Sequence, residues 1–120
     1  MDICFEGIGQ VVATFRTEDE TLEAGMAVTL KDSGTVGLSS KDNALCGVTV
    51  GAARGGAVAV QIGGVVKVGC PEWDAPNVGY AALACDGKGG VKAASGADGV
   101  KCLVLAVDGD KDKKSVVVKL

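Results

Sequence analysis

Three aspartates at alternate positions are the most suggestive chemical feature of this chain. Asp108, Asp110 and Asp112 lie in "VDGDKDKKS", a spacing typical of the first half of a calcium-binding loop. Such a loop requires glycine at its sixth position and glutamate at its twelfth, where this chain has Lys113 and Lys119. We therefore predict a solvated hairpin turn here and no metal site.

A second group of carboxylates lies in "RTEDETLEAG", residues 16–25. Its members are Glu18, Asp19, Glu20 and Glu23. Paired carboxylates perform acid–base chemistry where a pocket raises the pKa of one of them, and a run without an apolar lining normally lies in water. We predict an exposed turn. Arg54 and Lys67 are predicted to lie in solvent at strand ends rather than to bind an anion.

The five cysteines are candidates for metal binding or nucleophilic catalysis. They are Cys4, Cys46, Cys70, Cys85 and Cys102. No pair has the C-x-x-C spacing, and the chain has no histidine to complete a mixed zinc site or to act as the usual base of a cysteine nucleophile. We interpret them as free structural thiols of a reducing compartment.

Glycines in "GGAVAVQIGGVVKVG", residues 55–69, raise the question of a phosphate-binding loop. Neither the P-loop spacing nor the dinucleotide-binding spacing occurs, and the residues after Gly63 and Gly64 continue a strand pattern. These two glycines form either a tight hairpin turn or a bend in one long strand, and we favour the bend. The sequence thus predicts no catalytic residue, cofactor or metal, and hence no enzyme.

Trp73 is the one residue that we single out as a possible partner contact. It is the only tryptophan and lies between Pro71 and Pro76, which disfavour regular strand pairing. The ring either covers one end of the core as a lid or is offered to a partner.

Charge and hydropathy exclude other classes of function. The net charge is −3, and the lysines and arginines are scattered singly, so we predict no nucleic-acid binding. No window of the chain approaches the length of an apolar membrane span, and the N-terminus does not resemble a secretion signal. We therefore expect no membrane partner and a cytoplasmic protein when the host expresses it.

The second half of the chain repeats the first. Residues 25–62 and 79–120 share Gly25 with Gly79, Ala27 with Ala81, Asp32 with Asp86, Val36 with Val91, Asp42 with Asp98, Cys46 with Cys102, Val48 with Val104, Val58 with Val116 and Val60 with Val118. Each copy reads as short valine-rich strands separated by Asp/Gly turns. The prediction is an all-β fold, a single compact barrel or sandwich built from two tandem related halves. A strand at 9–16 precedes the first copy, and a strand with a linker at 63–78 precedes the second.

The order of "GQVVATFRTEDETLEAGMAVTL", "DSGTV", "CGVTV" and "GGAVAVQIGGVVKV" resembles a family of small phage- and prophage-encoded proteins, the head decoration or capsid cement proteins. The likeness is densest from Gly9 to Val68. It implies a structural β protein, often a homotrimer, whose partner is the major capsid protein and which ends up on the virion surface. The alternatives are a small bacterial β module that binds a protein or ligand, and a tail or fibre component.

Overall fold

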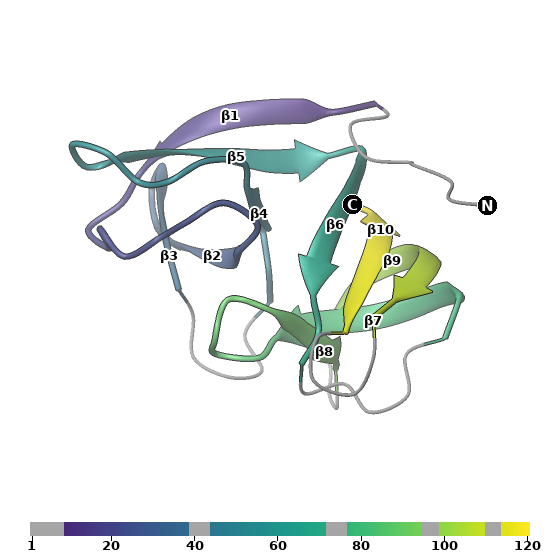
Figure 1. Cartoon of the computed structure of the whole chain (residues 1–120). Helices are drawn as coiled ribbons and strands as arrows, with labels where there is room; N and C mark the ends of the chain where they lie inside the picture. The colour runs from purple at the N-terminus through teal and green to yellow at the C-terminus, as the bar shows by residue number, and fades with distance from the viewer. Residues whose placement is uncertain (1–8, 39–43, 72–76, 95–98, 110–113) are drawn as a thin grey trace.

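The computed structural model describes residues 9–38, 44–71, 77–94, 99–109 and 114–120. These residues form ten β-strands and no helix, which confirms the all-β prediction. The strands are β1 (Val11–Arg16), β2 (Ala27–Asp32), β3 (Thr35–Gly37), β4 (Gly47–Thr49), β5 (Ala57–Gly63), β6 (Val65–Gly69), β7 (Gly79–Cys85), β8 (Val91–Ala93), β9 (Val100–Asp108) and β10 (Ser115–Lys119). Figure 1 shows them as two groups, β1–β5 and β6–β10, that lie side by side.

The first group is a closed barrel with the strand order β1-β3-β2-β4-β5. β1 pairs along its whole length with β5 in the antiparallel sense. A single parallel pair, Arg16 with Thr35, joins β1 to β3 and closes the barrel. Because every edge strand is then paired, this unit leaves no long open edge to solvent.

The second group is a five-stranded sheet with the order β6-β10-β9-β7-β8. When β6 is matched to β1 and each later strand to its counterpart, this is the strand order of the first unit read around the barrel in the opposite direction, except that the β1–β3 pair has no counterpart among the described residues. The antiparallel pairs are the same as well. The repeat is therefore a unit of five strands. The copies expected at 25–62 and 79–120 were too short, because β1 and β6 belong to them.

The strand pairing corrects one of the sequence matches between the two units. Ala27 lies opposite Val48 in the first unit. In the second, Ala81 lies opposite Cys102, and Val104 lies opposite Gly79. The paired positions are equally far apart along the chain in the two units, so Val48 corresponds to Cys102 when Ala27 corresponds to Ala81. The sequence match of Val48 with Val104 is therefore displaced by one step on the same face of the strand, while the strand order holds.

Turn chemistry agrees with the sequence pattern. The Asp32 carboxylate accepts the backbone N–H of Ser33 at 2.7 Å, and Gly34 has φ +65°. In the longer turn of the second unit the carboxylate of Asp86 accepts the N–H groups of Lys88 and Gly90 at 2.7 and 2.9 Å. Aspartate thus satisfies the backbone donors of both turns, and glycine supplies the left-handed conformation of the first.

Two apolar cores fill the molecule. The first lies inside the closed barrel and consists of Leu22, Val28, Val36, Ala53, Val58 and Val60. The second lies on the inner face of the second sheet and consists of Val68, Cys70, Leu83, Cys85, Val91, Cys102, Val104, Val116 and Val118, together with Ala27, Leu45 and Val48 of the first unit. Since neighbouring residues of a strand point to opposite faces, β2 supplies Val28 to one core and Ala27 to the other. The outer wall of the barrel therefore closes the second core.

A bend carries the chain from one unit to the next. β5 ends at Gly63 and β6 begins at Val65, and these two strands pair with different partners. Gly64 between them has φ +86°, which a residue with a side chain rarely adopts. Gly63 and Gly64 thus form a bend and not a hairpin turn. The buried amide of Gln61 donates to the carbonyls of Gly63 and Val65 at 3.0 and 3.1 Å and so holds the bend.

Candidate functional site

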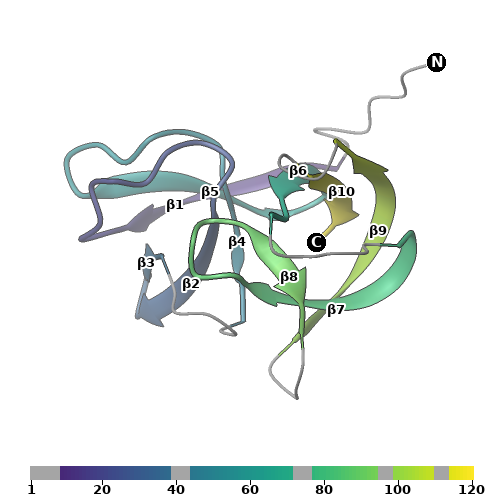
Figure 2. The ribbon, with the colours of Figure 1, turned by 60° about the horizontal axis from the view of Figure 1, so that its bottom comes forward.

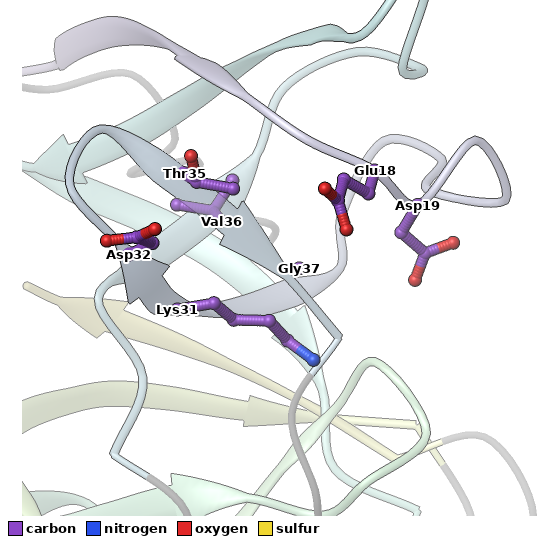
Figure 3. Close-up of a pocket in the computed structure, with 7 residues that line it drawn as sticks. All are labelled: Glu18, Asp19, Lys31, Asp32, Thr35, Val36 and Gly37. Carbon is purple, nitrogen blue, oxygen red and sulfur yellow. The ribbon is translucent and has the colours of Figure 1, made fainter.

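A small acidic hollow on the first barrel is the best-defined candidate site. It has a volume of about 290 Å³. Its lining residues come from the loop after β1 and from the β2–β3 hairpin (Figure 3): Glu18, Asp19, Lys31, Asp32, Thr35, Val36 and Gly37. Three carboxylates and one ammonium group therefore share a space that is slightly smaller than the usual range for sites of small organic ligands.

Local hydrogen bonds shape the loop that contributes Glu18 and Asp19. The Thr17 hydroxyl accepts the N–H of Asp19 at 3.0 Å, and the Asp19 carboxylate accepts the N–H of Thr21 at 3.0 Å. The Thr21 hydroxyl also donates to Asp19, and this bond lowers the pKa of the Asp19 carboxyl. Leu22 anchors the loop in the first core with 1 % of its surface exposed. The predicted turn is thus a fixed loop, because one apolar residue within the acidic run is buried.

Lys31 is the only cation among the described residues that line the hollow. Its aliphatic chain crosses Gly37, where a β-carbon would lie 3.0 Å from Lys31 Cε. In Figure 3 its amino group ends on the side of Glu18 and Asp19, and Asp32 lies on the opposite side. Its positive charge contributes to the lowered pKa of Asp19. The remaining negative charge suits a compact cation such as the side chain of a lysine or arginine.

A second, shallower hollow of about 510 Å³ lies beside the bend. Its lining residues are Gln10, Ala24, Gly25, Thr49, Val50, Gln61, Val65, Val66 and Lys67. The buried Gln61 amide is already occupied by the carbonyls of the bend, and its carbonyl oxygen accepts a hydrogen bond from Gln10 at 3.3 Å. The polar groups at its floor therefore stabilise the fold and are not free to select a ligand.

The cysteine thiols within the described ranges are mostly buried. Cys70, Cys85 and Cys102 are buried and Cys46 is half-buried, and none of these four forms a disulfide. Burial raises the pKa of Cys46, Cys70 and Cys102 above the ordinary thiol value of 9.0. These three thiols stay protonated at neutral pH and are weak nucleophiles. Cys4 lies outside the described residues.

The structure places the other predicted residues apart from the acidic hollow. Asp108 ends β9 and forms an ion pair with Lys67 at 3.3 Å. A hydrogen bond from the N–H of Gly109 and this lysine lower the pKa of Asp108. Asp110, Asp112 and Trp73 lie outside the described residues. Arg54 is exposed next to β5, and its backbone pairs with Ala57. No group of three or more Cys, Asp or Glu residues in the described ranges could hold a metal ion.

Asp86 is a buried polar residue that the sequence did not reveal. Only 2 % of its surface is exposed. One carboxylate oxygen accepts two backbone N–H groups, whereas the other has no hydrogen-bond partner among the described residues. Its sequence match in the first unit, Asp32, is exposed. The only signal for this burial in the sequence is the length of the turn. The turn of the second unit is longer than that of the first, and it folds back onto Gly69 and Pro71.

Comparisons of the chain with protein-family models and with curated proteins found no match. In the described part of the chain, no helix is long and apolar enough to cross a membrane. The fold and the hollow thus define the chain as an all-β protein of two five-stranded units with an acidic depression on the first.

Proposed function

We propose that this chain is a non-enzymatic structural protein of a phage or prophage head, which binds the outer surface of the capsid as a homotrimer and stabilises the shell. The observation that carries the proposal is the order of strand and turn motifs from Gly9 to Val68, which resembles the head decoration proteins. The partner is the major capsid protein.

Exposed apolar side chains support a role in protein contacts. Val11, Val12, Leu30 and Ile62 in the first unit and Val78 and Tyr80 in the second are each at least 41 % exposed. The second sheet also has two edge strands, β6 and β8, in contrast to the closed barrel. Open edges and exposed apolar groups are features that natural proteins normally cover by association.

Co-sedimentation tests the proposal directly. Purified protein is mixed with expanded capsids that lack decoration, and the bound fraction is measured after pelleting. We expect saturable binding that makes the shells more resistant to heat. Multivalent attachment on a symmetric shell should raise the apparent affinity above that of a single contact. Unexpanded procapsids serve as the control.

Absence of binding at micromolar protein would overturn the capsid role. Binding to phage tails instead of shells would assign the chain to the tail or fibre, the rival interpretation. The identity of the adjacent genes gives an independent check, since a major capsid gene and a head protease next to this gene favour decoration.

A further inference from the structure

The outer face of the second sheet gathers lysines that are far apart in the sequence. Leu103 on β9 lies between Tyr80 on β7 and Lys119 on β10 in the ladder. Lys101 lies two residues before Leu103 and therefore on the same face. Lys67 on β6 lies opposite Val117 of β10. We call this surface the lysine face: Lys67, Tyr80, Lys101, Leu103, Val117 and Lys119.

The lysine face points away from the first barrel except at Lys67, which lines the hollow beside the bend together with residues of the first unit. Residues of the opposite parity, such as Val104 and Val118, lie in the core that includes Val48 of the first unit. Because side chains alternate along a strand, the lysine face must lie on the other side of the sheet. Figure 2 shows β9 on the side of the molecule away from β2 and β3.

The lysine face has an apolar centre and a cationic rim. Tyr80 is 73 % exposed, and the Lys101 ammonium lies 5.2 Å from the centre of its ring. The strands β6, β7, β9 and β10 carry one acidic residue, Asp108, which is paired with Lys67 at the end of the sheet. An exposed tyrosine beside half-buried aliphatic groups is typical of the centre of a protein interface, and a cationic rim favours a partner surface of negative charge.

The complementary surface is on the first unit of the same chain. The acidic hollow and its loop present Glu18, Asp19, Glu23 and Asp32, and Lys31 is the one cation that lines the hollow in the part of the chain that the structure describes. The volume of about 290 Å³ is sufficient for one lysine side chain. Docking a lysine there would place an ammonium group among carboxylates that are already held in position by hydrogen bonds of the loop.

We propose that the lysine face of one copy docks on the acidic hollow of a second copy, head to tail. The two surfaces lie on different units of the chain, so each copy uses one surface for each neighbour. Such a heterologous contact closes into a ring when the rotation permits, and a trimer is one such ring. This inference shares with the proposed function only the expectation that the chain forms a homo-oligomer. A nucleic acid is the less favoured occupant, because the chain has a net charge of −3.

Charge reversal at each surface, followed by the double reversal, tests the contact. One variant carries Lys101→Glu and Lys119→Glu, and another carries Glu18→Lys and Glu23→Lys. Each should raise the dissociation constant of the wild-type oligomer by about 100-fold or more, because attractive pairs become like-charge pairs. The variant with all four substitutions restores opposite charges and should regain the wild-type size. Sedimentation velocity at protein concentrations of about 1–100 µM measures the size of the oligomer.

The control is Lys88→Glu with Lys114→Glu, which changes the net charge as much as the lysine variant but alters cations that belong neither to the lysine face nor to the lining of the acidic hollow. This control variant should form the same oligomer as the wild type.

Three outcomes would overturn the inference. The wild-type protein could stay monomeric, the single-surface variants could keep the wild-type size, or the four-substitution variant could fold without reassociating. Lysine-dependent binding of DNA or RNA by a monomer would also overturn it. Capsid binding is measured separately on the same variants. Charge-reversed variants that still oligomerise but no longer bind the capsid would rule out this contact between copies and leave the capsid role intact.

Discussion

Asp86 shows how a single residue can carry the stability of a turn. Its Oδ1 accepts the N–H groups of Lys88 and Gly90, and the residue is almost completely buried. Replacement by alanine removes the acceptor of the buried N–H of Gly90 and of the partly buried N–H of Lys88, and a buried donor left unsatisfied costs about 1–3 kcal/mol. Asparagine keeps the accepting oxygen in place.

We therefore predict that Asp86→Ala lowers the free energy of unfolding by about 2 kcal/mol or more, and that Asp86→Asn lowers it by less than half as much. Urea unfolding followed by circular dichroism measures both values. Equal losses in the two variants would mean that the charge of the carboxylate matters more than its two hydrogen bonds.

The buried thiols lead to a prediction on pH. Burial raises the pKa of Cys70 and Cys102 in the folded protein above 9.0, the ordinary thiol value. A raised pKa in the folded state means that these groups stabilise the fold while they are protonated, below pH 9.0, and that this contribution is lost as the pH rises above that value. Alkylation by iodoacetamide at pH 8, read by peptide mass spectrometry, should be slow at both sites and rapid in urea. Equal rates in the folded and unfolded protein would contradict this expectation.

At the scale of the strands, close contact between β4 and β5 depends on Gly47. A β-carbon at this position would lie 2.4 Å from the carbonyl oxygen of Gln61 and 2.7 Å from Val60 Cγ1. The first contact is with backbone, so the strands would have to separate to admit a methyl group. Gly51, a few residues later, has no atom within 4 Å of the same position and no positive φ.

Gly47→Ala should therefore destabilise the protein by about 3 kcal/mol, at the upper end of the usual cost of overpacking a core. The matched variant Gly51→Ala should be neutral or stabilise slightly, because alanine restricts the unfolded chain. Thermal unfolding of the two variants decides between a steric requirement and a general effect of glycine. A small loss for Gly47→Ala would show that β4 can move away from β5.

At the scale of the whole molecule, the two units share a core and should unfold together. Leu22 belongs to the first core and Leu83 to the second, and both are buried. The second core is incomplete without Ala27, Leu45 and Val48 of the first unit. Loss of either unit would thus expose apolar surface of the other.

Differential scanning calorimetry should accordingly show one transition with equal calorimetric and van't Hoff enthalpies. Leu22→Ala and Leu83→Ala should each lower this single transition, with a cost of about 2–5 kcal/mol. Two separate peaks, or a variant that shifts only part of the heat absorption, would show that the units unfold independently.

The sequence by itself determined the local chemistry of this protein. Alternating valines predicted strands such as β5 and β10, and Asp/Gly pairs predicted the turns, because both signals act over a few neighbouring residues. The duplication predicted two related halves, and the strand pattern on both sides of Gly63 and Gly64 favoured the bend that the structure contains. For the acidic run, the pattern predicted an exposed turn but did not reveal that Leu22 anchors it.

Only the tertiary structure decided which residues meet. The sequence did not reveal that β6 corresponds to β1. The order of strands in a sheet depends on contacts between distant segments, and few side chains are specific for one strand order. Only the pairing of the strands shows that Val48 corresponds to Cys102 and not to Val104, because the ladder fixes which positions of the two units are equivalent. The lysines of the second unit looked scattered along the chain, yet Lys67, Lys101 and Lys119 lie on one face, because strands distant in sequence become neighbours in the sheet. Pairing between segments that are distant in sequence also explains why the residues that line the acidic hollow come from two separate segments.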